Sequence, residues 1–215
     1  TEAAESLASL IAAGHDIVSV YSQPDRRAGR GRTKTPTPVS SYANEHGLSV
    51  FTPKSLRNNE EELSRLTEAK ADVFVVVAYG RILPPDILAI PPMGVVNIHP
   101  SLLPSFRGPS PVVTAVLEGR SHTGVTVMLL DEGMDTGPIL AQSPPKQLTG
   151  TEKGAELQVL LFKEGAGMLP AVLKGLEDGS ITPVVQDDSK ATVTRMLERS
   201  DGEIDWGASA VEIDR

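Results

Sequence analysis

Residues 73–78 form the longest strongly apolar run of the chain, reading Val-Phe-Val-Val-Val-Ala without interruption. A strand that is buried on both faces has this pattern, and such strands lie in parallel sheets that helices cover on both sides. The run is far shorter than the roughly 20 residues that a membrane-spanning helix requires. It therefore predicts an inner strand of an α/β sheet and gives no reason to expect a membrane partner.

The segments around this run alternate between helical and extended patterns. Apolar residues at helical spacing predict helices over residues 3–11, 39–46, 60–69, 111–117 and 151–176. Short apolar segments predict further strands over residues 16–21, 48–51, 95–98, 125–130 and 139–142. This order predicts a three-layer, Rossmann-like α/β fold whose mostly parallel sheet ends in a late antiparallel hairpin.

Several classes of site are excluded by composition and spacing. The chain has no cysteine, and its four histidines are scattered, so no metal site is expected. Neither a GxGxxG turn after a strand nor a GxxxxGK[ST] loop is present, which argues against dinucleotide and P-loop sites. The net charge of −8 excludes a protein that coats nucleic acid with its whole surface, so any such contact must be local.

Three polar residues suggest acyl-type chemistry at strand ends. Alternation along a strand places Asn97 and His99 on one face, and Asp135 follows a later strand in a loop flanked by glycines. An Asn amide can stabilise an oxyanion, a His can move a proton near neutral pH, and a carboxylate can orient the imidazole. From spacing alone, the more common interpretation is not catalytic. Asn97 and His99 would be a structural polar pair, and Asp135 would stabilise a turn.

The residues around these three resemble a known family. Residues 97–108, Asn-Ile-His-Pro-Ser-Leu-Leu-Pro-Ser-Phe-Arg-Gly, are similar to the signature of the 10-formyltetrahydrofolate-dependent formyltransferases, and residues 134–139 resemble its second signature. The resemblance implies the formyltransferase fold, a catalytic triad of Asn97, His99 and Asp135, and 10-formyltetrahydrofolate as the formyl donor without a metal. It further implies a folate pocket bordered by Tyr79, Gly80, Arg81, Ile82, Leu83, Ser101, Leu102, Leu103 and Pro104.

A basic segment, residues 25–34, distinguishes between members of that family. Residues 23–32, followed by residues 35–39, resemble a loop inserted in the members that act on methionyl-tRNA. The basic residues of the segment are Arg26, Arg27, Arg30, Arg32 and Lys34. Guanidinium groups bind phosphates in bidentate fashion, and glycines let the backbone approach them, so these residues are expected to bind tRNA. A solvated basic loop is the alternative.

The resemblance also implies a domain plan and a set of partners. Residues 1–186 would be the catalytic domain without the first strand of the family, and residues 187–215 a polar tail that leads to a β-barrel domain outside this sequence. The expected partners are folate and initiator methionyl-tRNA, for a monomer of the bacterial cytoplasm or an organellar matrix. The alternatives are a glycinamide ribonucleotide formyltransferase of purine synthesis, a sugar-nucleotide formyltransferase, and a folate- or tRNA-binding module without turnover.

Overall fold

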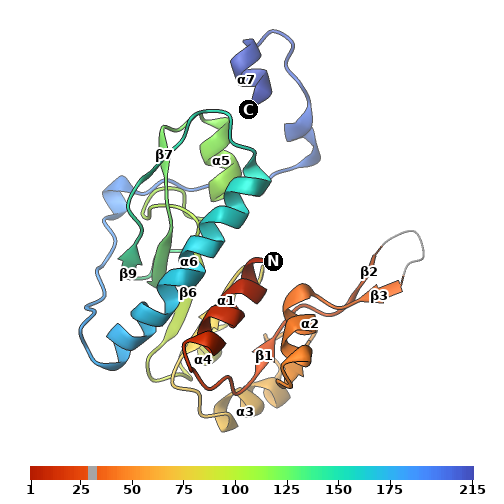
Figure 1. The fold of residues 1–215 in the computed structure, drawn as a ribbon, viewed down its shortest axis with the longest axis vertical. Helices are drawn as coiled ribbons and strands as arrows, with labels where there is room; N and C mark the ends of the chain where they lie inside the picture. Colours follow the sequence, from red (N-terminus) through yellow and green to blue (C-terminus); the bar gives the residue numbers. More distant parts are fainter. Residues whose placement is uncertain (29–32) are drawn as a thin grey trace.

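The computed structural model describes residues 1–28 and 33–215, which form a layered α/β fold (Figure 1). The helices are α1 (Glu2–Ala12), α2 (Pro38–Glu45), α3 (Glu60–Glu68), α4 (Pro85–Leu88), α5 (Pro111–Leu117), α6 (Gly154–Glu177) and α7 (Ala210–Asp214). The strands are β1 (Val20–Tyr21), β2 (Arg26–Ala28), β3 (Thr33–Thr35), β4 (Val50–Phe51), β5 (Phe74–Val76), β6 (Val95–His99), β7 (His122–Thr123), β8 (Thr126–Leu129), β9 (Ile139–Gln142) and β10 (Lys146–Gln147). None of the helices in the described ranges is long and apolar enough to cross a membrane.

The principal sheet has the strand order β5-β6-β8-β9. Strands β5 and β6 are parallel, whereas β6 pairs with β8, and β8 with β9, in antiparallel fashion. Strands β1 and β4 form a separate parallel pair. The prediction of an α/β fold with parallel strands followed by a late antiparallel hairpin is confirmed.

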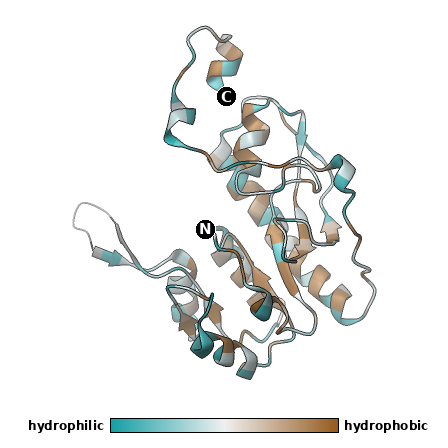
Figure 2. Ribbon diagram, turned by 180° about the vertical axis from the view of Figure 1, so that it is seen from behind, coloured by the Kyte–Doolittle hydropathy of each residue, from teal (hydrophilic) through white to brown (hydrophobic). Residues whose placement is uncertain are grey.

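Helices cover both faces of the principal sheet. On one face α6 packs against Val96 and Ile98, and it approaches closely because Gly165 has no side chain. On the other face Val95 packs with Ile87 of α4 and Leu66 of α3. Figure 2 shows the hydrophobic residues gathered on the central strands between these layers. Since side chains alternate along β6, Asn97 and His99 project from the face opposite α6.

Strand β5 departs from its prediction in one respect. Helices lie on both of its faces, since Val75 packs toward α6 while Phe74 and Val76 pack toward α3 and α4. All three residues of the strand are nevertheless only half-buried, and the expectation of complete burial is wrong. The reason is a cavity of about 750 Å³ between β1 and β5, which is lined by residues 17–23 and 71–79 and by the inner face of α1.

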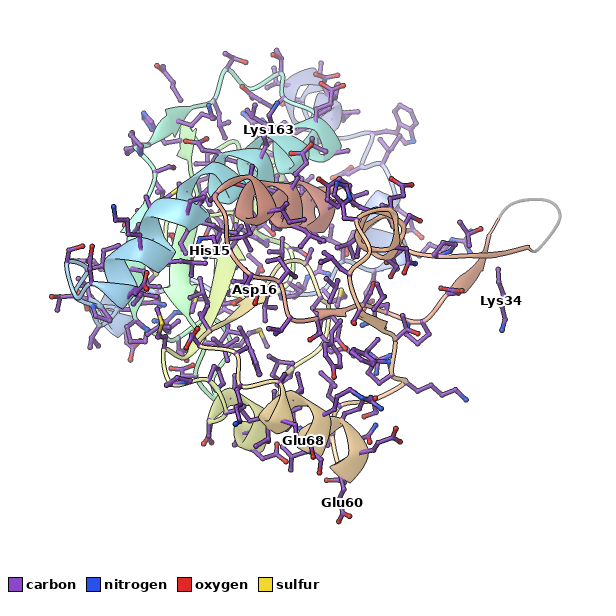
Figure 3. All side chains as sticks on the ribbon, turned by 60° about the horizontal axis from the view of Figure 1, so that its bottom comes forward. His15, Asp16, Lys34, Glu60, Glu68 and Lys163 are labelled. Atoms are coloured by element: carbon purple, nitrogen blue, oxygen red, sulfur yellow. The ribbon has the colours of Figure 1, made fainter. Side chains whose placement is uncertain are left out.

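The basic segment begins and ends in a hairpin. Strands β2 and β3 are antiparallel, with Arg26 opposite Thr35 and Arg27 opposite Lys34, and they project away from the sheet (Figure 1). Lys34 is exposed and lies far out on this projection (Figure 3). Arg30 and Arg32 lie outside the described residues.

Candidate active site

Strand β6 presents two of the predicted catalytic residues. Asn97 lies between Val76 of β5 and Met128 of β8, and its side chain is half-buried. Within residues 1–28 and 33–215, no group hydrogen-bonds the amide of this side chain, so its two N–H donors are free. A free amide donor in a partly desolvated position is suited to stabilise a developing negative charge.

His99 is buried, with 4% of its surface exposed, and both of its ring nitrogens face an oxygen atom. Its Nε2 lies 2.8 Å from the carbonyl oxygen of Phe106. A carbonyl oxygen only accepts, so Nε2 carries the hydrogen, and Nδ1 of the neutral ring has a free lone pair. Burial lowers the pKa of His99 below its ordinary value, while the Asp135 carboxylate and the Phe106 carbonyl partly oppose this effect. The ring is therefore neutral at pH 7.

Asp135 approaches the free nitrogen of this ring. Its Oδ2 lies 3.6 Å from Nδ1 of His99 and accepts a hydrogen bond of 2.8 Å from the backbone N–H of Gly108. Asp135 has a left-handed backbone with a φ of 55°, a conformation that Asp adopts more readily than most residues. The structure thus brings His99 and Asp135 together, as a proton-transfer pair requires.

Thr126 of β8 holds the loop after β6 by hydrogen bonds to its backbone. The Oγ1 atom of Thr126 donates to the carbonyl of Ser101 at 2.7 Å and accepts the N–H of Leu103 at 3.0 Å. The amide nitrogen of Gln142 donates to the same Oγ1 and to the carbonyl of Leu103, each at 2.9 Å. Of the predicted folate-pocket residues in this loop, Ser101 and Leu103 are buried, and Leu102 and Pro104 are half-buried.

The loop after β5 carries the other predicted folate-pocket residues. Gln23, which follows β1, donates to the carbonyl of Tyr79 at 2.9 Å and accepts from Nε of Arg81 at 3.0 Å, while Nη1 of Arg81 donates to the carbonyl of Lys54. Leu83 is buried, whereas Ile82 is 76% exposed and Gly80 is exposed with a left-handed backbone. The loops after β5 and β6 lie at the same carboxyl edge, where α/β sheets commonly bind ligands.

Tyr79 itself differs from the other members of this loop. Its hydroxyl group is buried, and no described residue hydrogen-bonds it. Burial raises the pKa of Tyr79 above its ordinary value, so the phenol remains protonated at neutral pH. Its carbonyl, and not its hydroxyl, makes the contact that joins this loop to Gln23.

Sequence reasoning missed a second layer of residues behind the site. Residues 184–194, here called the strap segment, fall partly in the predicted polar tail, yet they contact the loop that holds Phe106 and Gly108. Arg107 and Gln186 are buried there. No repeat or motif marks them, and the only sequence signal was that Arg107 belongs to the first signature. Among the described residues, no group of three or more His, Asp or Glu is placed to hold a metal ion.

Comparison with known proteins relates the whole chain to one family. Residues 2–173 match the family model described as formyl transferase. A methionyl-tRNA formyltransferase of Chloroflexus aurantiacus is 49% identical over 213 residues, which are 99% of this chain and 68% of that protein. A crystal structure of phosphoribosylglycinamide formyltransferase from Bacillus halodurans is 26% identical, has a TM-score of 0.68, and covers 83% of this chain and 91% of its own. An N-formyltransferase of Helicobacter canadensis, solved with folinic acid and dTDP-3-aminofucose, is 18% identical with a TM-score of 0.73, over 100% of this chain and 75% of its own.

Proposed function

Because the chain belongs to the formyl transferase family, we propose that it transfers a formyl group from 10-formyltetrahydrofolate to the amino group of methionyl-tRNA. The observation that carries the chemistry is the approach of Asp135 to Nδ1 of the neutral His99, beside the free amide of Asn97. The identity of 49% to a methionyl-tRNA formyltransferase supports the acceptor, compared with 26% to a phosphoribosylglycinamide formyltransferase.

Asn97 would act on the oxygen of the formyl group. When the amine attacks the formyl carbon, negative charge develops on that oxygen, and a preorganised amide donor stabilises it more than it stabilises the substrate. Removing one such donor commonly costs about 2.7–4 kcal/mol of transition-state stabilisation. The donors of Asn97 need no rearrangement for this role, since no other described residue holds them.

His99 and Asp135 would move the proton. The lone pair on Nδ1 takes a proton from the attacking amine, directly or through a water molecule, and Asp135 stabilises the resulting imidazolium. The protonated Nδ1 can then donate to the oxyanion beside Asn97 or to the nitrogen that leaves. The hydrogen bond from Nε2 to Phe106 keeps the ring in the tautomer that this sequence of steps needs.

The donor supplies an activated formyl carbon, and the loops at the carboxyl edge would hold it. We assign the border of the pocket to residues 79–83 and 101–104, whose exposed or half-buried members, such as Ile82, Leu102 and Pro104, offer apolar contacts. Asn97 pairs with Val76, the last residue of β5, so its free amide would meet the formyl oxygen near the start of the loop after β5. The Helicobacter protein with folinic acid supports a folate ligand for this fold.

The basic segment would hold the acceptor tRNA. It carries five basic residues and one acidic residue in a chain of net charge −8, and the described part projects from the body of the protein (Figure 1).

The proposal includes the expected domain plan, in which residues 187–215 lead to a β-barrel domain that also contacts tRNA. It also includes the further strand of the family, which is not among the strands that residues 1–28 and 33–215 form. That strand would fill the cavity between β1 and β5 and pair with β5, which forms the edge of its sheet. The bacterial relatives support a cytoplasmic location, and we expect a monomer.

A formyl-acceptor assay tests the proposal. The chain is incubated with 10-formyltetrahydrofolate and either methionyl-tRNA, glycinamide ribonucleotide or a dTDP-amino sugar, and each product is quantified. We expect formylated methionyl-tRNA, with the rate abolished by His99→Ala and unchanged by His122→Ala, which alters an exposed histidine on β7. Product with another acceptor alone would contradict the choice of tRNA, and folate binding without any product would indicate a binding module.

A further inference from the structure

The strap segment crosses from the edge of the sheet to the catalytic loop. Val184 exchanges two backbone hydrogen bonds of 2.8 Å with Ile139, the first residue of β9. Further along, Thr194 accepts the N–H of Ser110 at 3.1 Å and donates its own backbone N–H to the carbonyl of Arg107 at 2.7 Å. The segment follows the residues that match the family, which end at residue 173.

Residues 106–108 hold the catalytic pair on one side and the strap segment on the other. Phe106 accepts from Nε2 of His99, and Gly108 donates to Oδ2 of Asp135. Between them, Arg107 donates its N–H to Thr192 at 2.8 Å and accepts from Thr194, in the manner of a parallel strand pair. Gly108 must be glycine here, because its φ is +99° and a Cβ would lie 2.7 Å from the carbonyl oxygen of Thr194. Movement of the strap segment would therefore move both partners of the catalytic pair.

Gln186 joins this loop to the turn that carries Asp135. Its Nε2 donates to the carbonyl of Asp135 at 2.8 Å and to the carbonyl of Gly137 at 2.7 Å, while its Oε1 accepts from Nε of Arg107 at 3.0 Å. Gln186 and Arg107 are both more than nine-tenths buried, and Arg107 also donates to Asp188 at 2.7 Å. A buried amide with three of its four hydrogen bonds made fixes the groups that it contacts.

We propose that Gln186 is a positioning residue for formyl transfer, because its amide holds the left-handed turn that directs the Asp135 carboxylate toward Nδ1 of His99. The inference rests on the proposed function for its kinetic consequence, but not for its geometry. Gln186 touches neither His99 nor any reacting atom, and it acts through the backbone of Asp135. Without the two donated hydrogen bonds, the turn is free to relax, and the carboxylate no longer faces the imidazole at 3.6 Å.

Two variants separate this role from a purely structural one. Gln186→Glu keeps an acceptor for Arg107 but replaces the NH2 group, which donates both hydrogen bonds, by one oxygen that faces the two carbonyls. Gln186→Met removes all three hydrogen bonds at similar volume. In both we expect kcat to fall about 10- to 100-fold, as for other orienting residues, with KM values within about threefold. Gln158→Met serves as the control, because Gln158 also donates from a half-buried position but contacts Glu2 of α1.

A readout that needs no turnover accompanies the kinetics. The ring protons of His99, assigned by comparison with His99→Gln, are titrated by NMR in the wild type and in Gln186→Met. We expect the pKa of His99 to fall further in the variant, because the attraction of the Asp135 carboxylate is weakened. If Gln186→Met does not fold, the kinetics of Gln186→Glu decide the proposal.

An unchanged His99 titration in folded Gln186→Met, or a wild-type kcat in Gln186→Glu, would overturn the inference. If the wild-type chain formylates no acceptor, the proposed function fails by itself, and the titration still decides whether Gln186 positions Asp135.

Discussion

Gly108 donates its backbone N–H to the same carboxylate oxygen of Asp135 that faces His99, at 2.8 Å. One oxygen atom therefore serves both the loop after β6 and the imidazole. Because the N–H of Gly108 is a fixed donor, Asp135 keeps its orientation before any substrate binds. Preorganisation of this kind avoids a rearrangement at the moment of reaction.

Asp135→Asn separates the charge of this residue from its shape. The amide oxygen can still accept from Gly108, so we expect a folded protein in which the imidazolium loses its negative partner. The kcat should fall about 10²- to 10⁴-fold, the range of general acid–base catalysis. Glu132→Gln, in the same loop and exposed, is the matched control and should leave kcat unchanged. A normal kcat in Asp135→Asn would refute a charged role for Asp135.

Asn97→Ala removes the free amide donors from β6. We expect kcat to fall about 10²- to 10³-fold, because stabilisation of the formyl oxygen is lost in the transition state, while the Kd of the folate changes little. The measurement is single-turnover formyl transfer together with folate binding by fluorescence. Asn44→Ala on α2, where the residue is exposed, controls for loss of an Asn side chain. A Kd that rises as much as kcat falls would make Asn97 a binding residue.

The stability of the protein should depend on pH through His99. Burial holds the pKa of His99 below its ordinary value of 6.5 in the folded state, so the unfolded chain binds more protons below that pH. The contribution is therefore fully present above pH 6.5 and is lost as the pH falls toward the folded value. Urea unfolding at pH 7.5 and 5.5 should show that His99→Gln loses less stability at the lower pH than the wild type does. Equal losses in wild type and His99→Gln would contradict this assignment.

Replacing either of two glycines of α6 by alanine should change the free energy of unfolding, in opposite directions. At Gly165 a Cβ would lie 2.5 Å from Cγ2 of Ile98 and 3.0 Å from Cγ1 of Val125, both in the core, so Gly165→Ala should destabilise by about 1–3 kcal/mol. At Gly167 nothing lies within 4 Å, and Gly167→Ala should stabilise by about 0.5–1 kcal/mol. Free energies of unfolding in urea measure both effects. A stabilising Gly165→Ala would show that α6 can move away from β6.

Neutralising the five basic residues of the basic segment should weaken the use of tRNA. With all five changed to Gln, we expect a higher KM for methionyl-tRNA and a shallower salt dependence, by about 0.7–0.9 in slope for each phosphate that the protein no longer neutralises. Folate binding should not change. The same change at Lys163 and Lys174, which are exposed on α6, is the control for the loss of basic side chains elsewhere on the surface. A parallel decrease in folate binding would make the basic segment a structural element.

Local patterns predicted the elements of the sheet because their signals are contained in short stretches of sequence. The run at residues 73–78, the spacing of Asn97 and His99 on one strand, and the apolar stripe of α6 all belong to this class. Residue types and positions suggested the triad only weakly, and the family resemblance strengthened that prediction, because no local pattern requires Asp135 to contact His99. The contact between these two residues now supports that choice, while their roles remain proposals.

The parts that sequence reasoning missed depend on contacts between distant segments. Gln186 reaches Arg107 across 79 residues, and Thr126 reaches Ser101 across 25, in both cases with polar side chains that carry no periodic signal. The half-burial of β5 was missed for a similar reason. The same six apolar residues would read identically whether or not another strand filled the cavity beside them.

The strap segment is synthesised long after the loop that it contacts. Asn97 and His99 leave the ribosome early, yet the partners of Phe106, Arg107 and Ser110 are encoded 84–87 residues after them in the case of Thr192 and Thr194. At a translation rate of roughly 5–20 residues per second, on the order of 4–17 s pass between synthesis of residues 106–110 and synthesis of Thr192 and Thr194. During this interval residues 106–110 lack these partners, and Asp135 itself is made only in the course of it. Residues 106–110 can thus make these hydrogen bonds only when translation has passed residue 194.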